Sequence, residues 1–187
     1  MRRFMKVKVS GGVSSVNSDA PCFTRSSSVT WPFVEDRYGH RISYLRVSIT
    51  DRCNERCTYC MPQELQEWLP REGILSFEET LRLVRVAVGL GVSKVRVTGG
   101  EPLTRRDVLS FMQQLGQIPG LDDIGLSTNG TLLGREVQPR LTMAAALRAA
   151  RVRTVNVSLD TLDREAYRAT TGRDFLREAL AGGRLAA

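Results

Sequence analysis

Four short segments of alternating apolar and polar residues constrain the fold of this chain most, because each is followed by a stretch with helical periodicity. The predicted strands are Tyr44–Thr50, Lys94–Thr98, Asp123–Ser127 and Arg153–Leu159. The first predicted helix begins at a Ser76–Glu79 capping box. A second runs through Val108–Leu115, a third contains Ala145–Ala149, and two more occupy about 161–170 and 174–181. Strands that alternate with helices predict right-handed βα units and a parallel sheet. The fold class is therefore α/β.

Each predicted strand has one apolar and one polar face, whereas parallel strands are normally apolar on both faces. Helices must cover the apolar faces, so we expect the polar faces to line a shared, ligand-holding concavity. The alternative is a half-open sheet whose uncovered face meets water. The polar positions are Arg46/Ser48, Lys94/Arg96/Thr98, Asp123/Gly125/Ser127 and Asn156/Ser158/Asp160.

Three cysteines, Cys53, Cys57 and Cys60, follow the first predicted strand with the spacing C-x3-C-x2-C. Loops at the carboxyl ends of parallel strands are where such folds place their sites. A four-iron cluster held by three cysteines leaves one iron open to chelate a cofactor and pass it an electron. Zinc is the alternative and needs a fourth close ligand. The remaining candidates, His40 and Cys22, are not well placed for that role.

The bulk composition narrows the partners and the compartment. The formal charge of +7 favours anionic partners. Because the basic residues are dispersed, a nucleotide is at least as plausible a partner as a nucleic acid. No run of 18 apolar residues occurs, so we expect no membrane span. Four cysteines, three of them within eight residues, indicate metal ligation under reducing conditions rather than a disulfide scaffold.

Residues 1–34 differ from the rest of the chain. They are rich in Ser, Gly and Arg, and Asp19 is their only acidic residue. This composition predicts a disordered or leader segment. An organellar transit peptide and a mis-assigned start codon are the alternatives.

The cysteine triplet resembles the signature of the radical S-adenosylmethionine (SAM) superfamily. Gly99-Gly100-Glu101-Pro102, after the second predicted strand, resembles its second hallmark. Five stretches occur in the same order in the GTP 3′,8-cyclases of molybdenum cofactor biosynthesis (MoaA-like enzymes), and the similarity runs from about residue 35 to 175. They are Leu45–Cys53, Cys57–Pro62, Arg96–Leu103, Gly125–Gly130 and Asn156–Asp160.

The resemblance implies a fold and a set of site residues. The fold is a partial, truncated TIM-type βα barrel of about four parallel βα units, with residues 35–187 as an incomplete radical SAM core domain. The implied ligands of one 4Fe-4S cluster are Cys53, Cys57 and Cys60. The implied contacts of SAM are Tyr59, Gly100, Ser158 and, at its ammonium group, Glu101. The residues implied to face GTP are Arg46, Arg96 and Ser127.

The resemblance also implies a reaction and partners. Reductive cleavage of SAM gives a 5′-deoxyadenosyl radical, which abstracts a hydrogen from the ribose of GTP. An electron donor of the reductase or flavodoxin type and a downstream molybdopterin-precursor enzyme are implied partners. We expect a cytoplasmic location, or the mitochondrial matrix if residues 1–34 are a transit peptide.

One departure from the family pattern bears on activity. Family members are roughly twice as long as the matching core and bind GTP with a second cluster on three further cysteines, whereas here no cysteine follows Cys60. We therefore expect a fragment of a cyclase that lacks the C-terminal cluster. The alternatives are a minimal radical SAM enzyme with another substrate and a non-catalytic iron–sulfur binding remnant.

Overall fold

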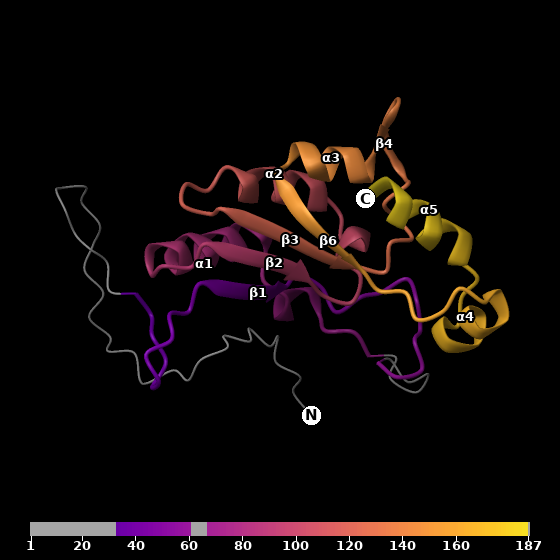
Figure 1. Ribbon diagram of the computed structural model, residues 1–187, viewed down its shortest axis with the longest axis horizontal. Helices are drawn as coiled ribbons and strands as arrows, with labels where there is room; N and C mark the ends of the chain where they lie inside the picture. Colours follow the sequence, from indigo (N-terminus) through magenta and orange to yellow (C-terminus); the bar gives the residue numbers. More distant parts are fainter. Residues whose placement is uncertain (1–32, 61–66, 187) are drawn as a thin grey trace.

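The computed structural model describes residues 33–60 and 67–186 (Figure 1). Short 3-10 turns interrupt the α/β alternation at two points. In chain order the elements are β1 (Tyr44–Ser48), η1 (Arg71–Gly73), α1 (Phe77–Gly89), β2 (Lys94–Thr98), η2 (Pro102–Thr104), α2 (Val108–Gly116), β3 (Asp123–Thr128), β4 (Glu136–Gln138), β5 (Leu141–Thr142), α3 (Met143–Ala149), β6 (Val152–Val157), α4 (Arg164–Thr171) and α5 (Leu176–Ala186).

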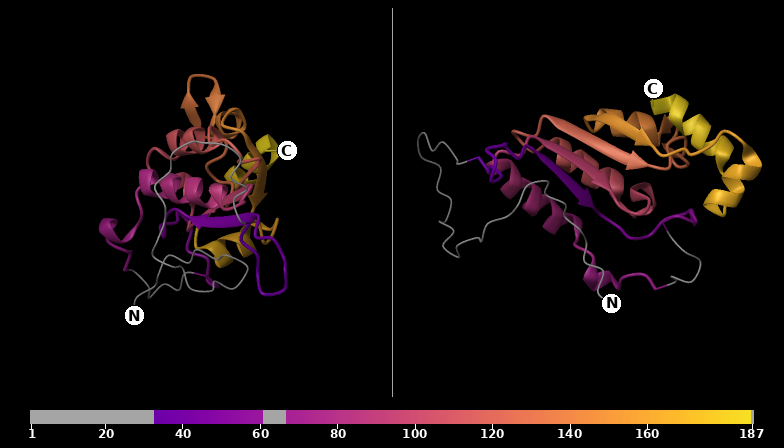
Figure 2. Two further views of the ribbon diagram at one scale, coloured as in Figure 1. Left: turned by 90° about the vertical axis from the view of Figure 1, so that its left-hand side faces the viewer. Right: turned by 60° about the horizontal axis from the view of Figure 1, so that its bottom comes forward.

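The main sheet contains four parallel strands in the order β1-β2-β3-β6. Helices α1, α2 and α3 lie against one face of this sheet, and α5 packs beside α3 and β6 (Figures 1 and 2). This architecture confirms the predicted α/β fold with four parallel βα units. It is the arrangement expected of a partial TIM-type barrel.

The hydrophobic core lies between the sheet and its helices. Alternate strand residues point into it, because successive side chains of a strand face opposite sides of the sheet. The strand residues in this core are Leu45, Val47, Val95, Val97, Ile124, Leu126 and Val152. Phe111 and Met112 of α2 and Leu81 and Val84 of α1 pack against them and are almost fully buried. Burial of these side chains orients Arg46, Arg96 and Ser127 toward the opposite face.

Helix α1 begins where the sequence predicts. The Ser76 hydroxyl accepts a hydrogen bond from the Glu79 backbone N–H at 3.1 Å, and the Glu79 carboxylate accepts from the Ser76 backbone N–H at 2.7 Å. This reciprocal capping box satisfies two backbone donors that the first turn of a helix leaves free. The predicted N-terminus of this helix is confirmed.

The polar residues of the strands share one face, as predicted, but the face is open. Arg46, Lys94, Asn156 and Ser158 are exposed to solvent. The four strands do not close into a ring, since β1 and β6 each have only one neighbour in the sheet. Within the described residues the face is therefore a half-open polar surface, which is the alternative raised from the sequence rather than an enclosed lumen.

The limits of some elements differ from expectation. β1 ends at Ser48, β3 extends to Thr128, and β6 spans Val152–Val157. The antiparallel hairpin of β4 and β5 is not predicted by the sequence analysis.

Most of the N-terminal segment, 1–34, lies outside the described residues, as does Cys22. Val34 is an exception, because its backbone N–H donates to the Leu90 carbonyl at 3.2 Å and its carbonyl accepts from the Ile42 N–H at 2.8 Å. The described helices include none with the length and apolar content needed to cross a bilayer.

Candidate functional site

The cysteine loop, residues 53–60, leaves the sheet just after the carboxyl end of β1. Cys53 is half-buried, Cys57 is buried and Cys60 is exposed, and none of the three forms a disulfide. The Glu55 backbone N–H donates to the Cys53 sulfur at 3.4 Å, and the Cys60 N–H donates to the Cys57 carbonyl at 3.1 Å. Three free thiols therefore lie on one short loop, and the second N–H bond folds it into a turn.

The electrostatics of this loop fit a cationic centre. Burial raises the pKa of the Cys53 thiol. Burial, with the nearby Glu55 carboxylate and Cys60, raises the pKa of the Cys57 thiol to about 12. Burial also raises the pKa of the Glu55 and Glu101 carboxyls. Four acidic groups thus share a poorly solvated region, and iron ions would stabilise their charged forms.

The described residues contain no group of three or more His, Cys, Asp or Glu side chains that could hold a single metal ion. A mononuclear zinc site needs its ligands to converge on one atom. A four-iron cluster binds each cysteine through a different iron, so its ligands lie farther apart. The donor set, three thiols from one loop, therefore fits a cluster better than one ion.

Asparagine and threonine side chains attach the cysteine loop to the carboxyl end of β3. The Asn54 side-chain amide donates to the Thr131 hydroxyl at 2.9 Å, and the Asn129 side-chain amide donates to Asn54 Oδ1 at 2.8 Å. An Asn-Gly pair such as Asn129-Gly130 usually forms just a turn. The turn exists, with Gly130 at a φ of 82°, but its Asn129 side chain also holds the loop.

Tyr59 and Ser158, both predicted SAM contacts, lie at this same end of the sheet. The Tyr59 hydroxyl donates to the Asp160 carboxylate at 2.7 Å, and its ring remains 65% exposed. The Asp160 contact, together with burial, raises the pKa of Tyr59. The Ser158 N–H donates to the Thr128 carbonyl at 2.9 Å, which leaves the exposed Ser158 hydroxyl at the end of β6. The structure thus brings both residues to the edge where the cysteine loop begins.

The Gly99–Pro102 segment lies directly against the start of the cysteine loop. The Gly100 N–H donates to the Thr50 carbonyl at 2.8 Å, and the Glu101 N–H donates to the Arg52 carbonyl at 2.8 Å. A Cβ at position 100 would overlap the Arg52 carbonyl oxygen. Glycine is therefore required here by the close approach of two backbone segments.

The Glu101 carboxylate is directed into the protein and is fully buried. It accepts hydrogen bonds from the Leu103 N–H at 3.0 Å and the Asn129 N–H at 2.7 Å. The Thr128 hydroxyl lies 2.9 and 3.0 Å from its two oxygens. These contacts join the end of β2 to the end of β3, and the expected contact of this carboxylate with the SAM ammonium stays a prediction.

The residues predicted to face GTP come together on the open polar face. The register places Arg46 of β1 beside Arg96 of β2, and Arg96 beside Gly125 of β3. The Arg96 guanidinium extends over Gly125, since a Cβ at position 125 would lie 3.3 Å from its Nε. Ser127, half-buried, follows two residues later on the same face.

The two arginines have no acidic partner among the described residues. Neither takes part in an ion pair there, and the buried Arg96 Nε has no hydrogen-bond partner. Among the described residues, neither arginine pairs with Asp123 or Asp160. Like charges on adjacent strands repel one another, so this pair is suited to an anionic ligand.

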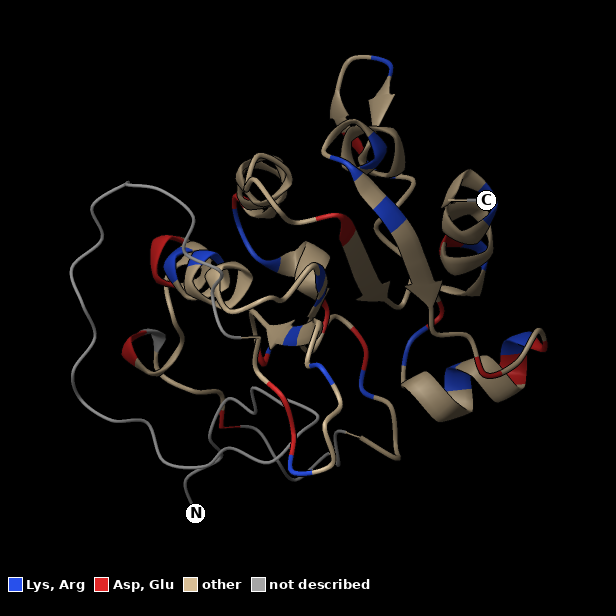
Figure 3. Cartoon of the chain, turned by 60° about the vertical axis from the view of Figure 1, so that its left-hand side comes forward, with Lys and Arg blue, Asp and Glu red and all other residues tan. Residues whose placement is uncertain are grey.

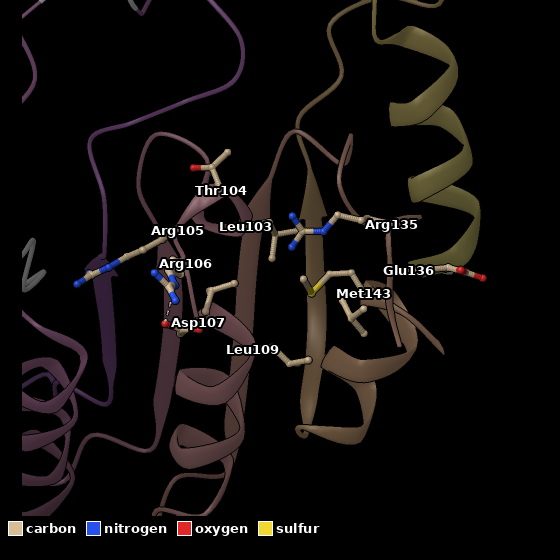
Figure 4. A pocket seen from close by; sticks show the side chains of 11 residues that line it. Leu103, Thr104, Arg105, Arg106, Asp107, Leu109, Arg135, Glu136 and Met143 are labelled. Atoms are coloured by element: carbon tan, nitrogen blue, oxygen red, sulfur yellow. Dashed lines mark ion pairs between the residues drawn. The ribbon is translucent and has the colours of Figure 1, made fainter. Parts of the chain in front are cut away.

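Two cavities lie away from the predicted site residues. One, of about 410 Å³, is bordered by the 104–107 loop, the start of α2 and the Arg135–Val137 segment (Figure 4). The other, of about 640 Å³, lies on the other side of the same loop and includes Arg52. The predicted site residues line neither cavity. Lys and Arg are spread over helices, strands and loops, with acidic residues among them (Figure 3).

Comparison with known proteins agrees with this geometry. The family model of the radical SAM superfamily matches residues 47–187. The GTP 3′,8-cyclase of Ectopseudomonas mendocina is 50% identical over 147 residues, which are 79% of this chain and 42% of that protein. The GTP 3′,8-cyclase of Thermodesulfovibrio yellowstonii is 48% identical over 139 residues, which are 74% of this chain and 41% of that protein. The GTP 3′,8-cyclase of Geobacter sulfurreducens is 46% identical over 147 residues, which are 79% of this chain and 43% of that protein.

The chain spans about two fifths of the length of these relatives. The matched region contains all four parallel strands except the first three residues of β1, and it includes the whole cysteine loop. The sequence match and the observed sheet therefore describe the same part of the molecule. On this basis the chain belongs to the radical SAM superfamily, and its sequence is similar to GTP 3′,8-cyclases.

Proposed function

We propose that this chain carries the cluster- and SAM-binding part of a GTP 3′,8-cyclase of molybdenum cofactor biosynthesis. The proposal rests on one observation: the predicted cluster-binding and SAM-binding segments all follow the carboxyl ends of parallel strands, at the same edge of the sheet. The cysteine loop follows β1, the Gly99–Pro102 segment follows β2, and Ser158 follows β6. The backbone bonds from Gly100 and Glu101 to Thr50 and Arg52 hold the first two of these together.

Cys53, Cys57 and Cys60 would hold a 4Fe-4S cluster, and SAM would lie between it and the strand ends. When bound, the cluster and SAM supply the electron and the 5′-deoxyadenosyl radical that abstracts a hydrogen from the ribose of GTP. The backbone of Gly100, the Tyr59 ring and the Ser158 hydroxyl would orient SAM. The Glu101 carboxylate, which also accepts from the Leu103 and Asn129 N–H groups and the Thr128 hydroxyl, would receive the SAM ammonium.

GTP would bind on the open polar face. Arg46 and Arg96 would neutralise its phosphates, and the Ser127 hydroxyl would offer a further hydrogen bond. The face remains open to water in the described residues, so exclusion of water from the reaction depends on what covers it. In the intact enzyme we assign that cover to the part of the relatives that this chain does not match.

Anaerobic reconstitution followed by dithionite reduction and electron paramagnetic resonance (EPR) tests the cluster and SAM assignments. We expect a four-iron signal that shifts when SAM is added. The Cys57→Ala variant should lose the signal because a cluster ligand is removed, while Cys22→Ala, a cysteine outside the motif, should retain it. A signal that ignores SAM, or that persists in Cys57→Ala, would contradict the proposal. Detection of 5′-deoxyadenosine then separates an active enzyme from a cluster-binding remnant.

Arg96→Ala tests the GTP assignment. We expect GTP affinity to fall about tenfold or more, since a hydrogen bond to a charged group contributes about 1.5–3 kcal/mol. The measurement is equilibrium dialysis of the reconstituted chain with labelled GTP. Lys94→Ala is the matched control, because Lys94 precedes Arg96 by two residues on the same face of β2 and is exposed. Equal losses of GTP affinity in both variants would show that Arg96 contributes only positive charge and no specific contact with GTP.

A further inference from the structure

Glu55 is a buried acid placed between two cluster cysteines. Its side chain is only 4% exposed. The Cys57 thiol donates to Glu55 Oε2 over 3.7 Å, and the Tyr167 hydroxyl donates to Glu55 Oε1. Tyr167 belongs to α4 and is 3% exposed. A chain of side-chain contacts therefore leads from Cys57 through Glu55 to a buried tyrosine in a helix far along the sequence.

Helix α4 also holds the backbone on both sides of Cys57. The Arg56 N–H donates to the Thr171 carbonyl at 2.8 Å, and the Thr58 N–H donates to the Thr170 carbonyl at 2.9 Å. These carbonyls belong to the last turn of α4, where the helix itself leaves them without partners. Tyr167 lies one turn earlier, and its carbonyl accepts from the Thr171 hydroxyl at 2.9 Å. The loop around Cys57 is thus attached to one rigid element by two backbone bonds and one side-chain bond.

The Tyr167–Glu55 side-chain bond differs from the backbone bonds, because Glu55 itself contacts the Cys57 sulfur. Burial and the Glu55 contact raise the pKa of Tyr167, so its hydroxyl keeps its proton and remains a donor. The Glu55 carboxyl has a second oxygen free to face Cys57. A cysteine that binds iron is a thiolate and has no proton to donate, so at a cluster the Tyr167–Glu55 bond would act by fixing the Glu55 side chain and the loop beside Cys57.

We propose that Tyr167 and Glu55 are positioning residues that fix the place of Cys57 at the cluster. The inference rests on the proposed function, since it requires that the cysteine loop holds a cluster. Glu55 has two roles in this proposal: it accepts the hydrogen bond from the Tyr167 hydroxyl, and it contacts Cys57. Glutamine provides an acceptor oxygen of the same reach and an amide group toward the sulfur, so Glu55→Gln should retain the function, whereas Glu55→Ala should not.

The test is cluster extraction by an iron chelator, together with the EPR spectrum of the reduced, reconstituted chain. We expect Tyr167→Phe and Glu55→Ala each to lose iron about tenfold faster than the unmodified chain, as is typical for loss of an outer-shell partner. Both should also show altered g-values. Glu55→Gln should behave like the unmodified chain. Because the two residues act through one contact, the double variant Glu55→Ala/Tyr167→Phe should be no faster than either single variant.

Tyr38→Phe is the matched control, since it removes one hydroxyl from a tyrosine that is 68% exposed. It should leave extraction and spectrum unchanged. Unmodified extraction and g-values in Tyr167→Phe, or additive effects in the double variant, would overturn the inference. Failure of the unmodified chain to take up iron would instead overturn the proposed function, so the two failures are distinguishable.

Discussion

Glu101→Gln is expected to lower the free energy of unfolding by about 3 kcal/mol, even without iron or SAM. Each carboxylate oxygen accepts a backbone N–H, one from Leu103 and one from Asn129. In either orientation, the glutamine amide nitrogen would face one of these donors in a fully buried site. A buried donor left without an acceptor is costly. Urea unfolding of the apo chain, followed by circular dichroism, measures the loss.

Glu136→Gln is the control for this prediction, because Glu136 is exposed in β4. It makes the same chemical change and should alter stability by no more than about 0.5 kcal/mol. If Glu101→Gln were equally harmless, the Glu101 carboxylate would not join β2 to β3.

Gly100→Ala is expected to cost about 3 kcal/mol and to prevent cluster uptake. The added methyl group would overlap the Arg52 carbonyl oxygen and lie 2.6 Å from the Asp51 carbonyl oxygen. Both are rigid backbone atoms immediately before Cys53. Relief of the overlap requires the start of the cysteine loop to move away from β2. Iron content per chain after anaerobic reconstitution, measured beside urea unfolding, reports both effects.

Gly89→Ala provides the comparison, since a Cβ at position 89 meets nothing within 4 Å at the end of α1. Alanine there should leave iron uptake unchanged and stabilise the helix slightly, by about 1 kcal/mol or less. Normal iron uptake in Gly100→Ala would show that the cysteine loop does not depend on close contact with the Gly99–Pro102 segment.

Much of the fold follows from local patterns in the sequence. Strict alternation at Lys94–Thr98 predicts β2 with its observed limits, and the Ser76–Glu79 pair predicts the start of α1. The same alternation places Arg46, Arg96 and Ser127 on one polar face. The ends of the other strands shift by one or two residues, because hydrogen-bonding neighbours rather than residue type decide where a strand stops.

The β4–β5 hairpin could not be predicted for a physical reason. Its strands have three and two residues, too few to show a period, and its turn has Arg140 at a φ of 64°. Pro139 before it favours a turn, but glycine or asparagine usually occupies the position with positive φ, so the signal is incomplete.

The attachments of the cysteine loop were missed for a different reason. Asn129, Asp160 and Tyr167 contact the loop only after the sheet and α4 have been assembled. A single sequence contains no signal for contacts of that range. One local clue was available, because Glu55 places an acidic residue between two thiols, where its charge would need a specific partner.

The long separation between the cysteine loop and its attachments has a consequence for synthesis of the protein. Asn54 contacts a residue 77 positions later, Tyr59 one 101 positions later, and Glu55 one 112 positions later. At roughly 5–20 residues per second, translation needs roughly 5–20 s to pass from Glu55 to Tyr167. During that interval the three thiols are present on the growing chain without the helix that orders them, and they are open to oxidation. On the proposed function, iron loading would follow the release of α4 from the ribosome, and the thiols would need protection from oxidation before then.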